Sequence, residues 1–361
     1  MKRVVLACVL ALASMGLAEA QQRVLNVYNW SDYIDPKLLQ RFTQETGIKV
    51  VYDTYDSNEI LETKLLAGNT GYDIVVPSGT FLQRQIKAGV FQPLDRSKLK
   101  NAGNIWPEID QRLAAYDAGN RHAVNYMWFT TGLAYDERKI AAITGGKPID
   151  SWDILFKPEE LKKFAGCGVY VLDSPEDLFS IALKYLGSDP DTTEQSKINA
   201  AADLLAKMRP HVKKFHSSEY INALAGGDIC LAVAWAGDAY QARNRAREAG
   251  KAIDIKYVIP KEGTLMSMDN LAIPKDAKNV EAAYMFIDFL LRPDVAAQNT
   301  AITNYANGVK PSQSLIPKDI IEDRSIYPDE SVLGRMFTIK PREPATQRLV
   351  TRAWTRVKTG R

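Results

Sequence analysis

The chain has 361 residues, of which 46% are hydrophobic and 25% are charged, with 46 basic and 43 acidic side chains. This composition excludes a disordered tail, a collagen and a coiled coil, and the length predicts two domains of roughly 150 residues each. A formal net charge of +3 leaves no electrostatic footprint for nucleic acid or for a membrane surface.

The first 20 residues have the pattern of a secretory signal peptide. Lys2 and Arg3 precede an apolar run over residues 4–17, and residues 18–20 form a small-x-small cleavage signal. A membrane anchor fits less well, because about 14 apolar residues rise only about 21 Å as a helix, short of a hydrocarbon core of roughly 30 Å. We therefore expect an exported mature protein.

Two cysteines, Cys167 and Cys230, remain after the signal peptide is removed. In an oxidising compartment we expect them to pair, with two buried thiols as the alternative. A disulfide closing a loop of about 64 residues would add on the order of 4 kcal/mol of stability. The histidines at 122, 211 and 216 lack any HExxH or CxxC context, so no metal site is expected.

Strands and helices alternate in the first part of the mature chain. The pattern predicts a strand over 23–28, a helix from Asp35 and Pro36 that Gly47 stops, a strand over 48–53, a helix over 57–67 and a strand over 72–76. Such alternation is typical of a parallel sheet covered on both faces. Ligands of these sheets bind at the carboxyl ends of the strands, which is where residues 30–32 and Ser78 fall.

The same alternation of strands and helices resumes after residue 130. We expect strands over 168–172, 229–235 and 255–259, then the segment 266–269 with an apolar run over 271–273, and helices over 175–185, 280–291 and 346–358. Pro293 would end the second of these helices. No long linker separates the two halves, so the sequence predicts two α/β lobes, a chain that crosses between them more than once, and a cleft at the hinge.

The candidate catalytic and nucleotide-binding motifs are incomplete in this sequence. Ser78 lies where a strand turns into a helix, but residues 76–80 lack the first glycine of G-x-S-x-G. Lys147 follows two glycines, yet Ala141 stands where a phosphate loop needs its first glycine, and no GxGxxG is present. We therefore expect no enzyme and no cofactor.

An aromatic residue beside an acid recurs at the predicted strand ends. The pairing occurs at Trp30, Asp32 and Tyr33, at Trp235 and Asp238, and in looser form at Asp177, Asp269 and Tyr305. Each residue alone has a structural explanation, as core or as a helix cap. Together, carboxylates and aromatic faces suit an organic cation, since the acid accepts charge-assisted hydrogen bonds and a ring contributes roughly 0.5 to 2 kcal/mol of cation–π energy.

As a set, several segments closely resemble the periplasmic putrescine- and spermidine-binding proteins of bacterial ABC transporters, with the putrescine-binding branch nearest. The segments are NWSDYI at 29–34, ETGIKV at 45–50, DSNE at 56–59, DIVVPS at 73–78 and AWAGD at 234–238. The likeness continues at 215–218, 259–263, 291–294 and 351–355, and it covers essentially the whole mature chain.

The resemblance implies a two-lobed periplasmic-binding-protein fold of the α/β class, in which each lobe is a mixed, mostly parallel sheet flanked by helices. Lobe 1 would comprise 21–132 plus about 260–300, and lobe 2 about 133–259 plus 301–361. The implied role is capture of putrescine or spermidine-like dications in the periplasm of a Gram-negative bacterium for import. The partners would be the polyamine and an inner-membrane ABC permease, for a monomer that binds no nucleic acid.

The resemblance also implies roles for individual positions. The aromatic walls of the ligand site would be Trp30, Tyr33, Trp235 and Tyr305. Polar contacts would come from Ser31, Asp32 and Ser78. One ammonium end would meet Asp238 and Asp269, and the other would meet Asp177 directly or through water. Cys167 and Cys230 occupy positions that form a disulfide in the putrescine-binding branch.

Two positions depart from the pattern of the putrescine binders. Asp177 replaces a glutamate and is one methylene shorter, so its reach to an amine would need a water. Ser267 replaces an aromatic residue two positions before Asp269, which would leave more room and weaker cation–π contact. A longer polyamine, a guanidinium such as agmatine, or weakened binding are all compatible with these changes, as is a sensor that feeds a signalling receptor.

Overall fold

The computed structural model describes residues 23–360, and the predicted signal peptide at residues 1–20 lies outside them. In this range the strands are β1 (Val24–Trp30), β2 (Lys49–Tyr55), β3 (Ile74–Val75), β4 (Ala123–Asp136), β5 (Val169–Val171), β6 (Lys214–Phe215), β7 (Leu231–Trp235), β8 (Ile255–Val258), β9 (Met266–Ala272) and β10 (Ala306–Asn307). They form one sheet with the order β2-β1-β3-β9-β4-β7-β5-β6, and β8 and β10 also pair with β4.

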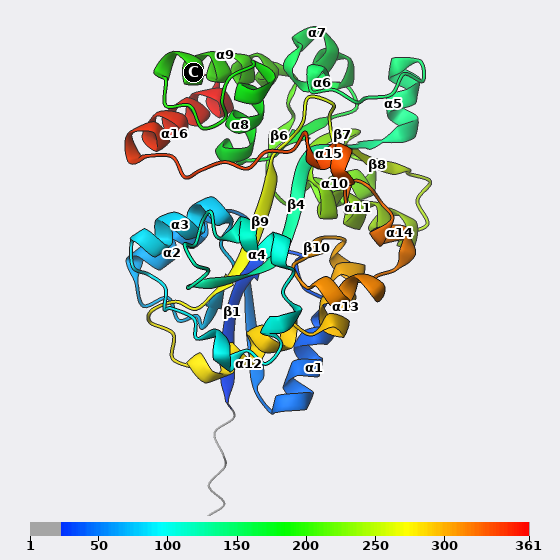
Figure 1. Ribbon diagram of the computed structural model, residues 1–361. Helices are drawn as coiled ribbons and strands as arrows, with labels where there is room; N and C mark the ends of the chain where they lie inside the picture. Colours follow the sequence, from blue (N-terminus) through cyan, green and yellow to red (C-terminus); the bar gives the residue numbers. More distant parts are fainter. Residues whose placement is uncertain (1–22, 361) are drawn as a thin grey trace, which may run out of the picture.

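Helices cover this sheet in two lobes, one below and one above in Figure 1. Those of the lower lobe are α1 (Pro36–Thr46), α2 (Asn58–Ala67), α3 (Gly79–Lys87), α4 (Pro107–Leu113), α12 (Val280–Leu290) and α13 (Pro293–Thr303). Those of the upper lobe include α5 (Glu137–Thr144), α6 (Asp153–Phe156), α7 (Pro158–Leu161), α8 (Pro175–Tyr185), α9 (Gln195–Met208), α10 (Tyr220–Gly226), α11 (Ala236–Glu248) and α16 (Pro344–Thr359). Two short helices, α14 (Lys318–Ile321) and α15 (Glu330–Leu333), lie on the segment that returns from the lower lobe toward α16.

Local capping chemistry explains the helix ends that the sequence predicts. The Asp35 carboxylate accepts a hydrogen bond from the backbone N–H of Lys37 at 2.9 Å, and Pro36 fills the first helical position of α1. The helix ends at Gly47, whose φ of 70° lies in the left-handed region that glycine adopts without a Cβ penalty. These bounds confirm the helix expected between Asp35 and Gly47.

One long strand, β4, runs from one lobe into the other. β4 pairs with β9 over residues 123–130 and with β7 over residues 131–135, so its first half belongs to one lobe and its second half to the other. All 14 residues of β4 are buried, and it is not among the predicted elements because it shows no alternation of polar and apolar residues. Since β4 and β9 run against their neighbours, the sheet is mixed, unlike the parallel sheet that the alternation of elements alone indicates.

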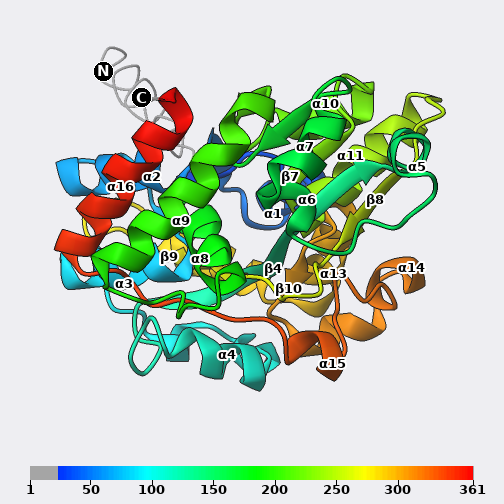
Figure 2. The same cartoon turned by 90° about the horizontal axis from the view of Figure 1, so that it is seen from above.

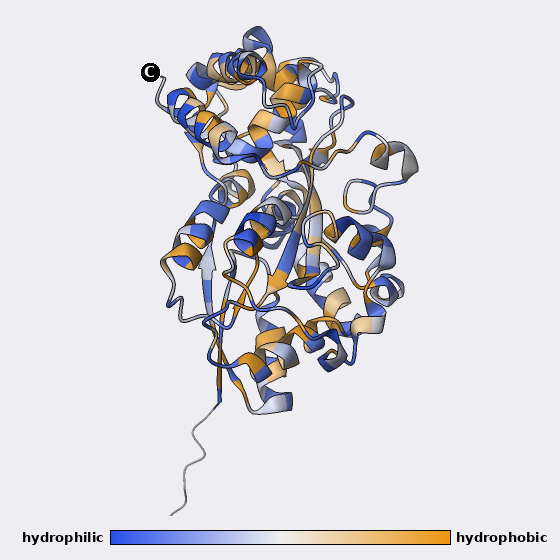
Figure 3. Ribbon diagram, turned by 60° about the vertical axis from the view of Figure 1, so that its left-hand side comes forward, coloured by the Kyte–Doolittle hydropathy of each residue, from blue (hydrophilic) through white to orange (hydrophobic). Residues whose placement is uncertain are grey.

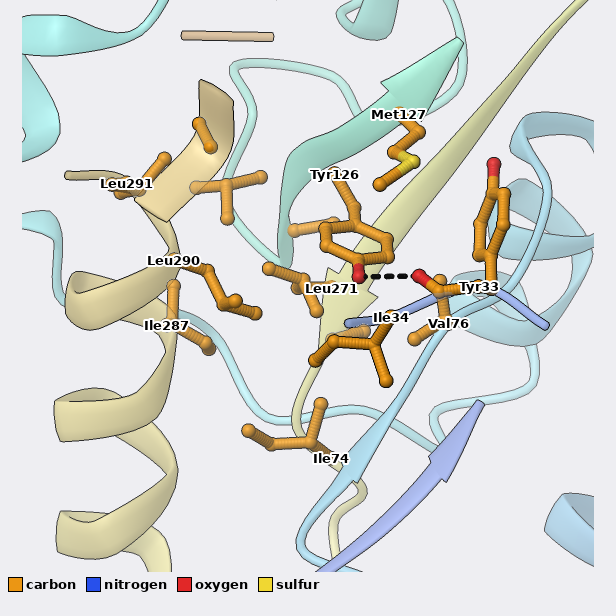
Figure 4. Packing of buried hydrophobic residues seen from close by; sticks show 14 of the residues in the cluster. Tyr33, Ile34, Ile74, Val76, Tyr126, Met127, Leu271, Ile287, Leu290 and Leu291 are labelled. Atoms are coloured by element: carbon orange, nitrogen blue, oxygen red, sulfur yellow. Dashed lines mark hydrogen bonds between the residues drawn. The ribbon is translucent and has the colours of Figure 1, made fainter. Parts of the chain in front are cut away.

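Each lobe has its own hydrophobic core. The first cluster draws mainly on residues 25–129, 266–297 and 305–327, and the second on residues 133–255 and 350–357. Figure 4 shows part of the first, in which Ile74, Leu271 and Leu290 meet and the Tyr126 hydroxyl donates to the backbone oxygen of Tyr33 at 2.7 Å. Because the core residues in 305–327 pack in the first cluster, we propose that lobe 1 extends over 301–327 as well as 23–132 and 260–300, leaving 133–259 and 328–360 to lobe 2.

The last helix packs along α8 and α9, as the view from above shows (Figure 2). Its face of Val350, Trp354 and Val357 is buried, while charged residues lie on its outer side. Polar and apolar residues likewise alternate along the other surface helices in Figure 3. None of the helices between residues 23 and 360 is both long and apolar enough to cross a lipid bilayer.

Cys167 and Cys230 form a disulfide, which confirms the expected pairing over the alternative of two buried thiols. Their Cα atoms are 5.5 Å apart, within the usual range for a bridge. The bond ties the segment before β5 to the start of β7, two neighbouring parallel strands of lobe 2.

Candidate ligand-binding site

One cavity lies between the lobes, at the ends of β1, β7 and α8 and along β9, and encloses about 730 Å³ of space including the part that opens to solvent. Ten of the eleven site residues predicted from sequence line it. These are Trp30, Ser31, Tyr33, Ser78, Asp177, Trp235, Asp238, Ser267, Asp269 and Tyr305. Segments up to 275 positions apart in the sequence therefore meet in one place, as strand ends in an α/β fold do.

Asp32 is the predicted residue that does not line the cavity. Its backbone adopts a φ of 56°, in the left-handed region, where the chain turns from β1 toward α1. The Asp32 carboxylate accepts a hydrogen bond from Arg245 Nη2 at 2.6 Å, and 41% of its side chain is exposed. Because Arg245 lies on α11 in the other lobe, Asp32 joins the two lobes beside the cavity.

Asp269 is buried on β9, with 2% of its surface exposed. Its carboxylate accepts a hydrogen bond from Ser78 Oγ at 2.6 Å, and Ser78 is held in turn by Asn58, whose side-chain amide donates to the same Oγ at 2.9 Å. Burial disfavours the charged form and raises the pKa of Asp269 to about 7, although the Ser78 hydrogen bond opposes this shift.

Asp238 lies in the first turn of α11 and is 5% exposed. Its carboxylate accepts hydrogen bonds from the hydroxyls of Tyr305, at 2.6 Å, and of Tyr220. Burial raises the pKa of Asp238 to about 6, against the effect of these two donors. Tyr220 is not among the predicted site residues, because it lies on α10 and its link to Asp238 depends on the packing of α10 against α11.

Asp177 occupies the first turn of α8. It accepts hydrogen bonds from Ser174 Oγ at 2.6 Å, from the Thr131 hydroxyl and from the indole N–H of Trp235 at 3.4 Å. Burial raises its pKa, and the three donors partly offset that effect. Ser174 could be anticipated from sequence as the residue before Pro175 at a helix start, but Thr131 could not, because β4 carries no sequence signal.

Aromatic rings line the cavity as a connected series. The ring centroids of successive members lie 4.6 to 5.8 Å apart, at angles typical of edge-to-face and tilted contacts. The series runs through Tyr33, Tyr305, Phe129, Trp235, Trp30 and Tyr55. Phe129 and Tyr55 are absent from the sequence prediction: Phe129 lies inside the fully buried strand β4, and Tyr55 is the buried last residue of the otherwise more exposed strand β2.

The ionisable side chains that line the cavity are all acidic in the part of the chain that the structure describes. Its lining includes seven carboxyl side chains, which are Asp56, Glu59, Asp173, Glu176, Asp177, Asp238 and Asp269. No lysine, arginine or histidine is among the described residues that line it. Buried carboxylates without a compensating charge are costly, so the cavity favours a ligand that brings positive charge.

Comparison with known proteins agrees with this geometry. The family model for bacterial extracellular solute-binding proteins matches residues 37–325. The chain belongs to this family. Among curated relatives of this solute-binding protein, the putrescine-binding periplasmic protein PotF of Escherichia coli is 49% identical, covering 98% of this chain and 96% of the relative. The putrescine-binding periplasmic protein SpuD of Pseudomonas aeruginosa is also 49% identical, covering 99% and 98%.

A solved structure shows the same fold in the family. The spermidine/putrescine ABC transporter substrate-binding protein PotD of Streptococcus pneumoniae superposes with a TM-score of 0.76 at 30% identity, over 93% of this chain and 99% of that one. The relatives are binding proteins, so the solute-binding family assignment makes this chain a binding protein and not an enzyme.

Proposed function

We propose that this solute-binding protein captures a linear polyamine, putrescine or a spermidine-like cation, in the periplasm and delivers it to an inner-membrane ABC permease. The observation that carries the proposal is the gathering of Asp177, Asp238 and Asp269, all buried, in a cavity walled by aromatic rings and free of basic side chains in the described lining. The names of the 49% identical relatives, both putrescine-binding, support the same ligand class.

The chemistry of a polyamine matches these walls. Each ammonium group donates three hydrogen bonds and carries one positive charge, so it suits a carboxylate such as Asp238 or Asp269 that keeps lone pairs beyond those used by Tyr305 or Ser78. The methylene segments between the amines suit the ring faces. A ligand with too few charges would leave a buried carboxylate unpaired, and this penalty would select for spaced dications.

Contacts between the lobes support capture by closure. Besides Asp32 and Arg245, Thr80 on α3 donates a hydrogen bond to Glu176 on α8 at 2.7 Å, and Glu176 lines the cavity. A ligand that touches both lobes stabilises the closed arrangement by its contacts with the second lobe. We assign the ten lining residues predicted from sequence to ligand contact and Asp32 to the lobe-to-lobe ion pair.

Isothermal titration with putrescine, cadaverine, spermidine, agmatine and arginine, each at two salt concentrations, tests the proposal. We expect one ligand per protein, with tightest binding for a linear polyamine or its guanidinium analogue agmatine, and little binding of arginine, because its carboxylate would face the acidic walls. Asp269→Asn should abolish most of the affinity. Asp254→Asn is the matched control, since Asp254 pairs with Lys256 at the surface, 3.3 Å away. Absence of heat with every amine would reject the polyamine role.

The proposal also covers the assembly state. We expect a monomer. We also expect no binding of nucleic acid, since a net charge of +3 is small for 361 residues and the cleft is lined by acids. Size-exclusion chromatography with light scattering, with and without ligand, checks the mass. A stable dimer at micromolar concentration would contradict this part.

A further inference from the structure

Phe129 lies at a point of the cavity wall where two strands face each other. It belongs to β4, is 7% exposed and lines the cavity. In the antiparallel pairing of β4 with β9, Phe129 stands directly opposite Ser267, which lines the same cavity. Directly opposed residues project from the same face of a sheet with Cβ atoms about 4.5 to 5.5 Å apart. The large ring of Phe129 and the small hydroxymethyl group of Ser267 therefore lie side by side in the cavity wall.

Phe129 is also the link between the two halves of the aromatic series. Its ring lies 5.3 Å from that of Tyr305 at 87° and 5.8 Å from that of Trp235 at 65°. Tyr305 continues to Tyr33, and Trp235 continues to Trp30 across the lobes. Removing the Phe129 ring would separate these two pairs.

The polar groups of three nearby aromatic residues already donate hydrogen bonds within the protein. Tyr305 donates to Asp238, the Trp235 indole donates to Asp177, and the Trp30 indole donates to the backbone oxygen of Val76. Phe129 has no polar atom on its side chain, so it cannot contact an ammonium group by a hydrogen bond or hold a carboxylate. Its surface suits methylene groups, the apolar part of a polyamine.

We propose that Phe129 is the wall against which the methylene segment of the ligand lies, and that the opposed pair of Phe129 and Ser267 sets the width of the cavity and hence which amines fit. The inference rests on the proposed polyamine function. From sequence, Ser267 is expected to leave an open side where the putrescine binders carry a ring. In the structure, Phe129 on the neighbouring strand β4 supplies an aromatic surface beside Ser267. The small Ser267 side chain leaves the space that the Phe129 ring requires.

A substitution cycle at these two positions tests the pairing. Phe129→Ala removes the apolar contact and should weaken binding of the best diamine by roughly 10- to 100-fold, the equivalent of losing most of a buried phenylalanine surface. Ser267→Phe places a second ring opposite that of Phe129 and should also weaken binding, because the two rings together would fill space that the ligand needs. The double variant moves the ring from β4 to β9 and should recover at least tenfold of the affinity lost in Phe129→Ala.

Two further variants separate ring contact from general packing. Phe129→Leu keeps apolar bulk without the flat ring and should fall between the wild type and Phe129→Ala. Phe215→Ala removes a half-buried ring that packs on Trp354 in lobe 2, outside the cavity lining, and should leave the affinity unchanged. Melting temperatures of the ligand-free variants confirm that each one is folded before titration.

The titrations distinguish the failure of this inference from the failure of the proposed function. If the wild type binds no amine, the polyamine role is rejected and this inference falls with it. If the wild type binds a diamine but Phe129→Ala binds it within twofold, the inference alone is overturned. A double variant whose loss equals the sum of the two single losses would also overturn it, because independent sites add and an opposed pair does not.

Discussion

Lowering the pH from 8 to 5 should weaken polyamine binding, because the buried carboxyl groups of Asp269 and Asp238 must be ionised to hold ammonium groups. Burial raises the pKa of Asp269 to about 7 and that of Asp238 to about 6 in the empty cavity. The amines of the ligand have pKa values near that of lysine, about 10.4, so the ligand stays fully charged throughout this range. Protons therefore compete with the ligand only at the protein.

The magnitude follows from the pKa values. Ionising Asp269 at pH 5 costs a factor of about 100 in affinity and ionising Asp238 a factor of about 10, whereas both groups are ionised at pH 8. If the ligand needs both carboxylates, the affinity should fall about 1,000-fold between pH 8 and pH 5. At pH 6.5 binding should release about one proton per ligand.

The same shifts give the empty protein the opposite pH dependence. Because the folded pKa values of Asp238 and Asp269 are raised above the ordinary aspartate value of about 3.9, the folded state binds more protons than the unfolded state between these values. Their contribution to stability is fully present below about pH 4 and is lost as the pH rises through 6 and 7. The ligand-free protein should therefore melt at a higher temperature at pH 5 than at pH 8.

Titration calorimetry at pH 5, 6, 7 and 8 measures the affinity, and buffers with different ionisation heats measure the released protons. Asp269→Asn should remove the share of the pH dependence that Asp269 supplies and should raise the melting temperature of the ligand-free protein at pH 8. Affinities at pH 5 and pH 8 that agree within threefold would refute the reasoning, since the cavity carboxyls would then already be ionised without ligand or would not meet it.

Three further outcomes are expected. Replacing Cys230 by serine should lower the free energy of unfolding by about 4 kcal/mol, from the loop of 63 positions that the bridge closes, and urea unfolding with and without reductant checks this value. Gly237→Ala should weaken putrescine binding at least tenfold, because the new Cβ would overlap the ring of Tyr305 and displace it; wild-type affinity would contradict that clash. Arg245→Ala should change the affinity less than about fivefold, since its ion pair with Asp32 is partly exposed, and the effect should vanish in high salt.

The sequence predicts the local elements well where neighbouring residues encode them. The helix over 175–185 has the same bounds in the structure, with Ser174 as its cap. The strand expected over 229–235 is observed as β7 from Leu231. It is followed directly by α11, so Asp238, expected at a strand end, lies in the first turn of that helix. Capping, proline placement and periodicity are properties of short segments, which is why they can be read without the fold.

The missed residues of β4 have a different origin from the misplaced Asp32. β4 is buried along its whole length and pairs with β7, β8, β9 and β10, so its sequence has neither the alternation of an amphipathic strand nor the period of a helix. Phe129 and Thr131 were therefore not predicted at the site. Asp32 was expected in the cavity, yet its carboxylate lies with Arg245, 213 positions away in the sequence.

By itself, the sequence determines the class of chemistry: acids and aromatic residues at strand ends, without a nucleophile motif or a cofactor motif, favour binding of an organic cation. Only the tertiary structure decides which of these acids are buried together and which are paired with a base. Desolvation, and therefore the pKa of Asp238 and Asp269, depends on the sum of atoms brought around each carboxyl group by both lobes. No single segment of the chain determines this desolvation, because the surrounding atoms belong to strands and helices that become neighbours only when the lobes pack.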